Sequence, residues 1–282
     1  MPFYAVHQGF YEGVQTRLDL LRHTCMSQGL EYVVIDSATC DYTHLPTLTK
    51  KDVLFQVSLG SQTLLSLLLN PHVTTPYIVN PELSFITSTV QWSILHDKAG
   101  LSAPKTIYSL TSDRNLLKRY VDYLGGFPIV IKKIGGSRGI GTMKVEGWHG
   151  LLSLADYLVT TADTFIMREF ISGDYGVRAI TLSGTILKAS KFFYQENDFR
   201  NAAVLSNCKY ESINLDLQGS DLCIRALQVA NLEFAGVDLI FDDKDVPHLL
   251  EVNYPTGFQS FLDDPQPVLS RLVSHLKRKS ES

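Results

Sequence analysis

The stretch AGVDLIFDDKDVPHLLEVN, residues 235–253, holds two apolar runs, each interrupted by polar side chains. Residues 237–241 and 248–253 are rich in residues that favour strands, so each run predicts a β-strand. The acidic segment DDKD between them, at residues 242–245, predicts a hairpin turn. The two strands are therefore expected to lie side by side.

Asp238, Glu251 and Asn253 are the polar side chains inside these runs. Burying a carboxylate without a cation is costly. Alternation along a strand places Glu251 and Asn253 on one face, and hairpin pairing can set Asp238 beside them. Three hard oxygen ligands suit a magnesium ion that bridges nucleotide phosphates, so these residues are the predicted metal site. The alternative is a pair of strand carboxylates facing solvent at a sheet edge.

A glycine-rich loop, GGSRGIG at residues 135–141, lies between a predicted strand at 127–133 and a return strand at 143–145. Glycines allow several backbone N–H groups to approach an anion, which predicts a phosphate cradle; the alternative is a flexible hairpin tip. The loop is neither a Walker A loop nor a Rossmann turn, because no Gly-Lys-Ser/Thr follows and the loop opens a strand. Lys132 ends the preceding strand, where it could reach a phosphate or simply be exposed.

Two further polar residues are candidates for the site. Arg200 lies in the irregular segment NDFRN, residues 197–201, and could neutralise charge on a phosphoryl or oxyanion group, or be an ordinary surface arginine. Glu169 interrupts the β-rich run FIMREFI, residues 165–171. It could accept hydrogen bonds from a ligand, or pair with Arg168 or Arg178.

Taken in order, these segments resemble an ATP-grasp carboxylate ligase, and within that superfamily the chain is most similar to the RimK-like branch. The segments are the strand ending in Lys132, the glycine loop, MREFI at 167–171, DFR at 198–200, AGVD at 235–238 and EVNYPTG at 251–257. The resemblance runs from about residue 85 to 272. It implies an α/β and α+β fold in which two α+β subdomains grip ATP, preceded by a pre-ATP-grasp α/β domain.

The resemblance also implies a chemistry and residue roles. The ATP γ-phosphoryl group would pass to a carboxylate, giving an acyl phosphate that an amine attacks. Lys132 would contact the α and β phosphates, Arg200 would steady the transition state, and Glu169 and Phe170 would lie at the adenine hinge. Magnesium, with manganese as the alternative ion, would be held by Asp238, Glu251 and Asn253. The implied nucleotide-binding positions are Lys132, Gly135, Gly136, Ser137, Gly139, Gly141, Arg168, Glu169, Phe170, Ile171, Asp174, Arg178 and Asn201.

The chain departs from the pattern of its relatives at three places. An early lysine that contacts nucleotide is replaced by Thr89 or Gln91. Gly176 stands where relatives often carry an acidic ribose-binding residue, which leaves Asp174 as the substitute. The strand at residues 191–194, KFFY, is aromatic where the glutamate-adding enzyme is basic, which disfavours an acidic amino acid as substrate.

The order of helical and strand-like runs predicts three units. Residues 1–84 are expected to form the pre-ATP-grasp α/β domain with a parallel sheet, and residues 85–162 a small α+β lid. Residues 163–282 are expected to be the nucleotide- and metal-binding subdomain, with runs at 165–171, 177–182 and 185–193 in one antiparallel sheet. Helices are predicted at 221–234 and 267–279.

The composition of the 282 residues excludes several classes. At 45% hydrophobic residues the chain can bury a core, and its net charge of −4 predicts no attraction to nucleic acid or to an anionic membrane. No apolar segment is long enough to span a bilayer and no signal-peptide pattern is present, so a cytoplasmic protein is expected. The four cysteines form no CxxC pair, which favours buried thiols over a zinc or redox site.

The first functional hypothesis is an ATP-dependent ligase that joins a small carboxylic acid or amino acid to an amine or peptide acceptor and releases ADP and phosphate. This chemistry needs no protein nucleophile, so the lack of a Ser-His-Asp or Cys-His signature is consistent with it. The alternative is a nucleotide-binding module without ligase activity, regulatory or a partner subunit. A dehydrogenase is disfavoured, because the glycine loop lies between strands. The sequence does not decide whether the chain forms a homo-oligomer, because the apolar face of residues 60–69 could be core or interface.

Overall fold

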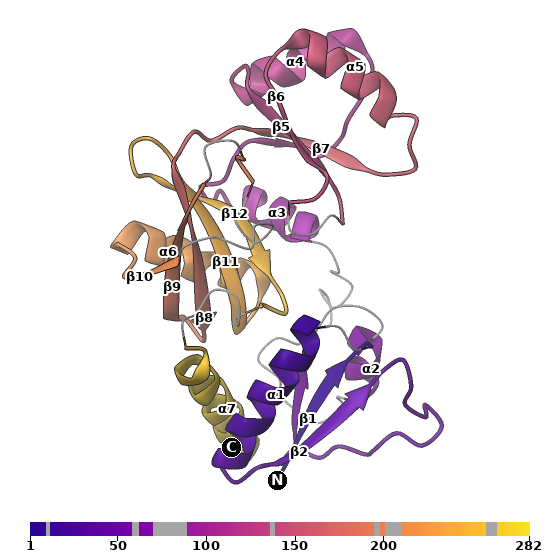
Figure 1. Cartoon of the computed structure of the whole chain (residues 1–282), viewed down its shortest axis with the longest axis vertical. Helices are drawn as coiled ribbons and strands as arrows, with labels where there is room; N and C mark the ends of the chain where they lie inside the picture. The colour runs from indigo at the N-terminus through magenta and orange to yellow at the C-terminus, as the bar shows by residue number, and fades with distance from the viewer. Residues whose placement is uncertain are drawn as a thin grey trace.

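The computed structural model of the chain has three parts stacked along its longest axis (Figure 1). The structure describes residues 1–9, 12–57, 62–69, 89–135, 139–194, 198–200, 210–257 and 264–282. A three-stranded sheet lies at one end, a five-stranded sheet in the middle and a four-stranded sheet at the other end. Both termini lie at the end that holds the three-stranded sheet.

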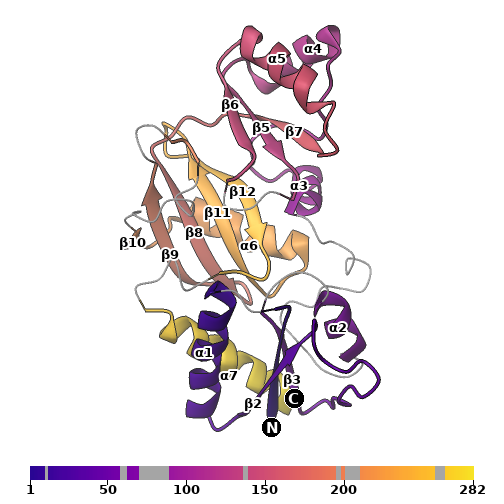
Figure 2. The same ribbon diagram turned by 45° about the vertical axis from the view of Figure 1, so that its right-hand side comes forward.

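The three-stranded sheet is parallel and has helices on both faces. Its strands, in sheet order, are β2 (Glu31–Asp36), β1 (Pro2–His7) and β3 (Val53–Gln56). Helices α1 (Glu12–Ser27) and α7 (Gln266–Glu281) lie side by side on one face, and α2 (Gln62–Leu69) packs on the other (Figures 1 and 2). The predicted parallel sheet is confirmed, although its central strand β1 does not stand out in the sequence.

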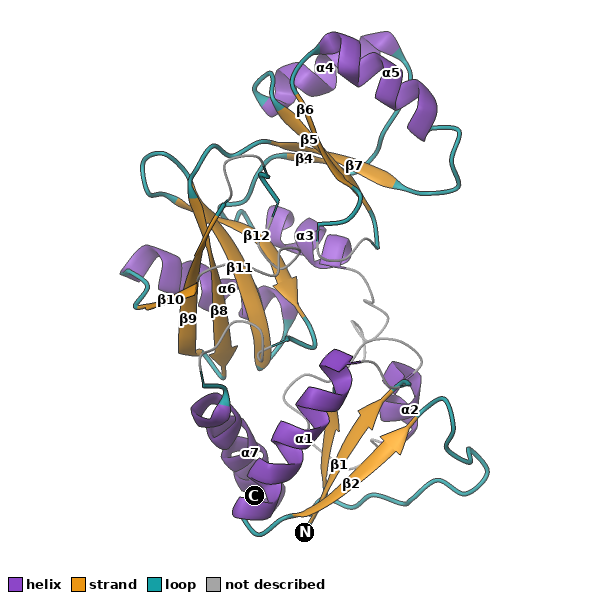
Figure 3. Ribbon diagram, in the orientation of Figure 1, coloured by secondary structure: helices purple, strands orange, loops and turns teal. Residues whose placement is uncertain are grey.

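The four-stranded sheet is covered on one face by α4 (Arg114–Leu124) and α5 (Trp148–Leu158), as Figure 3 shows. Its strands, in sheet order, are β4 (Thr106–Ile107), β7 (Phe165–Glu169), β5 (Ile129–Lys133) and β6 (Thr142–Val145). Ile131 and Met167 are fully buried in the core beneath the helices. The opposite face carries Lys132, Lys144 and Arg168, because strand pairing aligns Val130 with both Lys144 and Arg168.

Strand β7 pairs with β4 and β5, so the predicted place of residues 165–171 in one sheet with 177–182 and 185–193 is wrong. Phe165 and Met167 supply apolar side chains that complete the core of the small sheet. An apolar β-rich run shows that a strand forms, but not which sheet it joins. The expected domain boundary after residue 162 therefore falls before the last strand of the four-stranded sheet.

The five-stranded sheet is antiparallel throughout. Its strands, in sheet order, are β10 (Tyr210–Ile213), β9 (Thr185–Phe193), β8 (Tyr175–Leu182), β11 (Phe234–Phe241) and β12 (Pro247–Asn253). Helix α6 (Leu217–Ala230) packs on one face, in contact with α3 (Thr89–Lys98). The hairpin expected from residues 235–253 is confirmed, because β11 and β12 pair directly.

Two helices differ from their expected positions. Helix α6 begins before the predicted residue 221, because the Asp216 carboxylate accepts a hydrogen bond from the backbone N–H of Gly219 at 2.7 Å. It ends at Ala230, since Asn231 adopts the left-handed conformation with φ of 52°, so Phe234 opens β11 instead. Helix α3, expected in the lid, packs on β12 and α6 of the large sheet.

The described residues show the state of three of the four cysteines. Cys25 and Cys223 are buried free thiols, as predicted, and Cys40 is partly buried. Cys208 lies outside the described residues. Within the part of the chain that the structure describes, no helix has the length and apolar character needed to cross a lipid bilayer.

Candidate functional site

Strand pairing aligns Arg178, Asp238 and Glu251 in one row across β8, β11 and β12. Residues directly opposite each other in antiparallel strands point to the same face of the sheet. Asn253 shares that face, and its Nδ2 donates a hydrogen bond of 2.9 Å to Oδ2 of Asp238. The structure therefore brings together the three residues of the predicted metal site, as strand alternation implies.

Asp238 is almost completely buried and forms an ion pair with Arg178, whose Nε and Nη2 both donate to the carboxylate. Arg178, predicted to contact nucleotide, is thus bound to the predicted metal ligand. Burial alone would lower the pKa of Arg178, but the charge and hydrogen bonds of Asp238 raise it. The arginine therefore keeps its charge inside the protein.

Glu251 meets Lys132 across the gap between the two sheets. The Lys132 Nζ lies 3.0 Å from Glu251 Oε2, and each side chain is 25% exposed. Lys132 has the largest influence in lowering the pKa of Glu251 to about 2, against the opposing effect of burial, and Arg178 and Arg168 lower it further. Glu251 is therefore ionised at neutral pH, which a hard divalent cation requires of its oxygen ligands.

Arg168, predicted to contact nucleotide, forms a second link between the sheets. Its Nε donates to Oγ1 of Thr106 at 3.1 Å, and its Nη1 donates to the carbonyl oxygen of Leu250 at 3.3 Å. The side chain is buried, and burial lowers its pKa while Glu251 acts in the opposite direction. Its described hydrogen bonds therefore join β7 to β4 in its own sheet and to β12 in the five-stranded sheet.

The glycine loop is described in part. Gly135, Gly139 and Gly141 lie in turns with positive φ, a conformation that glycine adopts without strain. The backbone N–H of Lys133 donates to the carbonyl oxygen of Gly141 at 2.9 Å and continues the pairing of β5 with β6. Gly136 and Ser137 lie outside the described residues.

The predicted hinge follows β7. The Oε2 of Glu169 accepts a hydrogen bond of 3.0 Å from the backbone N–H of Lys105. The ring of Phe170 lies 6.2 Å from that of Phe199 and has the Nζ of Lys144 at 4.4 Å from its centroid. Lys144 was missed by the sequence reasoning; the signal was a lysine in the return strand of the hairpin that carries Lys132. The remaining predicted positions, Ile171 and the exposed Asp174, lie between β7 and β8.

Arg200 is bound by its own neighbour. Its Nε and Nη2 donate to the Asp198 carboxylate at 2.8 and 2.6 Å. The contact of Phe199 with Phe170 places this segment beside the hinge. Across the described ranges, no ion pair or hydrogen bond joins Arg200 to the predicted metal ligands. Asn201 lies outside those ranges.

Gly176, one of the departures from the relatives, lies directly opposite Phe192 on β9. A Cβ at position 176 would come within 2.4 Å of the Phe192 ring. That ring is fully buried and also contacts the rings of Tyr194 and Tyr210, with centroids 5.9 and 6.4 Å away. Phe192 therefore occupies the space that an acidic side chain at position 176 would need.

The donor set has the chemistry of a magnesium site, with two carboxylates and one amide on one face of the sheet. Within the described part of the chain, no group of three or more His, Cys, Asp or Glu side chains could hold a metal. The assignment of Asp238, Glu251 and Asn253 as metal ligands stays a prediction, and in the structure Glu251 and Asp238 are each held by a cation of the chain.

Solved ATP-grasp ligases share this architecture of two facing sheets. PsnB, solved in complex with minimal precursor, Mg and ADP, aligns with a TM-score of 0.70 at 19% identity, covering 97% of each chain. The D-alanine–D-alanine ligase from Bacillus anthracis aligns with a TM-score of 0.69 at 18% identity, covering 100% of this chain and 97% of that one. The chain therefore has the ATP-grasp fold, as the sequence predicts.

Within that class, the family model described as the RimK-like ATP-grasp domain matches residues 91–265, and the chain belongs to this family. A probable alpha-L-glutamate ligase of Trichodesmium erythraeum is 28% identical over 188 residues, which cover 65% of this chain and 61% of the relative. One from Rhodopirellula baltica is 26% identical over 161 residues, which cover 56% of this chain and 39% of the relative. The chain thus matches less than two thirds of the length of these curated relatives.

Proposed function

We propose that the chain is an ATP-dependent carboxylate–amine ligase that forms an amide or peptide bond and releases ADP and phosphate. Membership of the RimK-like family and the ligase names of its relatives support this proposal. The observation that carries it is the contact of Lys132 with Glu251. Lys132 lies beside the glycine loop, and this contact brings it to a carboxylate of the five-stranded sheet. The phosphates and the metal ion of a nucleotide would meet at this position.

The proposed reaction has two steps. A carboxylate is a poor electrophile, because oxide would have to leave. Transfer of the γ-phosphoryl group of ATP to the carboxylate oxygen breaks the bond to ADP and gives an acyl phosphate. An amine then attacks the carbonyl carbon, the C–N bond forms, phosphate leaves with the oxygen, and the amine gives up a proton. Both steps need positioning and charge stabilisation, but no protein nucleophile.

In this reaction, the basic residues would contact phosphate and the acidic residues would bind the metal ion. Lys132 and Lys144 present ammonium groups on the face of the small sheet that is turned toward Glu251. On nucleotide binding, Lys132 would exchange Glu251 for a phosphate oxygen. Asp238, Glu251 and Asn253 would hold magnesium, or manganese in its place, and the ion would offset the negative charge of the phosphates. The proposed partners are ATP, a small carboxylic or amino acid, and an amine or peptide acceptor.

The test is nucleotide turnover. The protein is incubated with Mg-ATP and pools of acids and amines, and ADP, AMP and phosphate are measured. The proposal predicts ADP release that needs both an acid and an amine, and its loss in Glu251→Gln. The matched control is Glu211→Gln on β10, which removes an exposed carboxylate of the same sheet. Acid-dependent AMP release, or no turnover with any pool, contradicts the proposal.

A second candidate is a nucleotide-binding module without ligase activity. It is favoured by the cations that hold both predicted metal carboxylates, and by Thr89 or Gln91 standing where relatives carry the early lysine. Under this alternative, bound ATP stays intact with every pool, and Glu251→Gln changes nucleotide affinity alone.

A further inference from the structure

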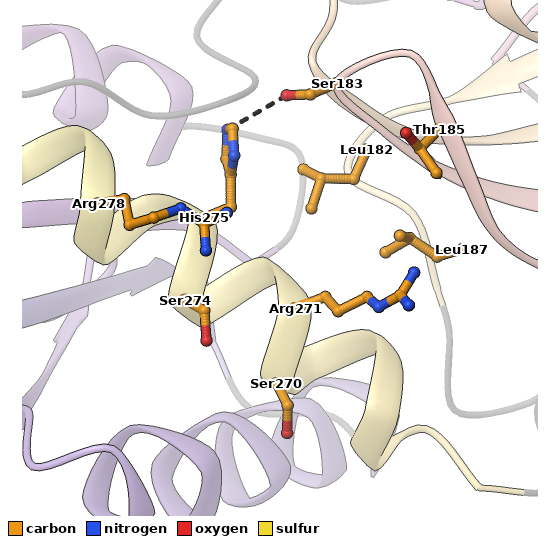
Figure 4. A pocket seen from close by; sticks show the side chains of 9 residues that line it. All are labelled: Leu182, Ser183, Thr185, Leu187, Ser270, Arg271, Ser274, His275 and Arg278. Atoms are coloured by element: carbon orange, nitrogen blue, oxygen red, sulfur yellow. Dashed lines mark hydrogen bonds between the residues drawn. The ribbon is translucent and has the colours of Figure 1, made fainter.

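A cavity of about 490 Å³ lies between helix α7 and the turn that joins β8 to β9 (Figure 4), and neither Glu251 nor Lys132 lines it. Arg271, His275 and Arg278 line it from the helix. Ser183 and Thr185 line it from the turn. The cavity therefore has walls from two distant parts of the sequence.

All the ionisable residues that line the cavity are basic, in a chain whose net charge is −4. Arg271 and Arg278 are seven residues apart on α7, so they lie on one side of the helix, about 10 Å apart along its axis. Within the described residues, neither arginine has an ion pair or a hydrogen bond. The cavity is thus open and lined by two exposed arginines whose charge no described side chain balances.

Glu233, the acidic side chain that contacts His275, is also bound to Lys279. Its Oε2 lies 3.0 Å from Nε2 of His275, and its Oε1 accepts a hydrogen bond from Lys279. His275 Nε2 also lies 3.3 Å from Oγ of Ser183. These contacts tie α7 to the β8–β9 turn and keep Glu233 in contact with His275 and Lys279.

We infer that this cavity binds a small oxyanion, a phosphate or a carboxylate, at a site separate from the predicted nucleotide site. A guanidinium group pairs with such anions through two parallel hydrogen bonds, and the hydroxyl groups of Ser183 and Thr185 can add neutral donors. Leu182 and Leu187 line the turn side and offer apolar surface to a carbon skeleton. The volume falls within the range of small-molecule sites, about 300 to 1,000 Å³.

Such a ligand would bridge two parts of the molecule. Helix α7 packs on α1, where Nε2 of Gln28 donates to the carbonyl oxygen of Ser270 at 3.0 Å. The β8–β9 turn belongs to the sheet that carries Asp238. An anion held by Arg271 and Thr185 would therefore fasten the amino-terminal part to the sheet of the predicted metal site.

The test is calorimetric titration of the full chain with citrate and with pyrophosphate, at constant ionic strength. We expect one of the two to bind at one site per chain, and the better probe identifies the preferred oxyanion. Arg271→Gln and Arg278→Gln should each weaken binding about tenfold or more, because each removes a charge-assisted hydrogen bond. Arg119→Gln, an exposed arginine on α4, is the matched control and should bind like wild type.

Lys132→Gln separates the two sites, because it should leave the binding of the probe unchanged. The inference is overturned if neither probe binds, if Arg119→Gln weakens binding as much as the cavity variants, or if only Lys132→Gln weakens it. Circular dichroism and melting temperature without anion check that the variants fold. Should an arginine variant misfold, Thr185→Val at the other wall must weaken binding instead, and wild-type affinity in that variant would also overturn the inference.

Discussion

Lys132 Nζ and Glu251 Oε2 lie 3.0 Å apart although Lys132 belongs to the four-stranded sheet and Glu251 to the five-stranded sheet. Each is the counter-ion of the other in a partly buried position. The two predicted ligands of Mg-ATP, one for phosphate and one for metal, therefore neutralise each other in this structure. Nucleotide binding must replace this contact with contacts of similar strength.

Lys132→Met should weaken binding of Mg-ATP by about 10- to 100-fold, the value of one charge-assisted hydrogen bond. A titration with a fluorescent ATP analogue measures this effect. Lys133→Met is the matched control, because Lys133 points to the other face of β5 and pairs with Asp163 at 2.7 Å. Equal losses in the two variants would show that Lys132 has no specific contact with the nucleotide.

Glu251 should make stability depend on pH in the acid range. The pKa of Glu251 in the folded protein is about 2, below the usual value of 4.5. Its contribution to the free energy of unfolding is therefore complete above pH 4.5 and is lost as the pH falls toward 2. The shift corresponds to about 3 kcal/mol. The free energy of unfolding of wild type should therefore fall more steeply between about pH 5 and pH 2 than that of Glu251→Gln.

Urea denaturation at several pH values measures these slopes. Glu211→Gln is the control, because this carboxylate is exposed and has no ion pair within the described residues. It should keep the slope of wild type. If Glu251→Gln also kept that slope, the Lys132 contact would not persist in solution.

Asp238→Asn should lower the free energy of unfolding by about 3 to 5 kcal/mol, because it removes the charge that pairs directly with the buried Arg178. Replacing both partners, with Arg178→Met and Asp238→Leu, should restore much of this loss. Asp198→Asn is the comparison, since its partner Arg200 is one-third exposed, and it should cost about 1 kcal/mol or less. A double variant no more stable than Asp238→Asn would argue that other contacts dominate at this position.

Gly176→Ala should cost about 1 to 3 kcal/mol, because the new methyl group would overlap the ring of Phe192. Combining it with Phe192→Leu should recover part of the loss by making room. Gly150→Ala in α5 is the control: its nearest neighbour would be 3.7 Å away, and alanine should stabilise the helix by about 0.5 to 1 kcal/mol. Thermal melting curves measure the stability change of both variants. If Gly176→Ala is as stable as wild type, the Phe192 ring moves freely.

The sequence predicts the β11–β12 hairpin and the shared face of Asp238, Glu251 and Asn253, because strand alternation and a polar turn are local properties. It also shows that a buried Asp238 needs a cation. It does not show which cation, since Arg178 becomes its neighbour only when β8 pairs with β11.

Other features depend on contacts between distant residues in the same way. The sheet that β7 joins is decided by Phe165 and Met167 fitting the core under α4 and α5. Lys144 lies on the face of Lys132 only because of the register of β5 with β6. The periodicity of the sequence predicts these strands, but it does not predict the strands with which they pair.

Helix α7 buries Leu269, Leu272 and Leu276 in the same core as Phe3 and Ala5 of β1. During synthesis, the strands of the parallel sheet leave the ribosome well before α7, so the part of their face that α7 covers beside α1 stays exposed until α7 follows. A nascent or shortened chain would thus display this surface to chaperones and to other copies of itself. Completion of the core on this face of the three-stranded sheet therefore depends on the sixteen-residue helix α7.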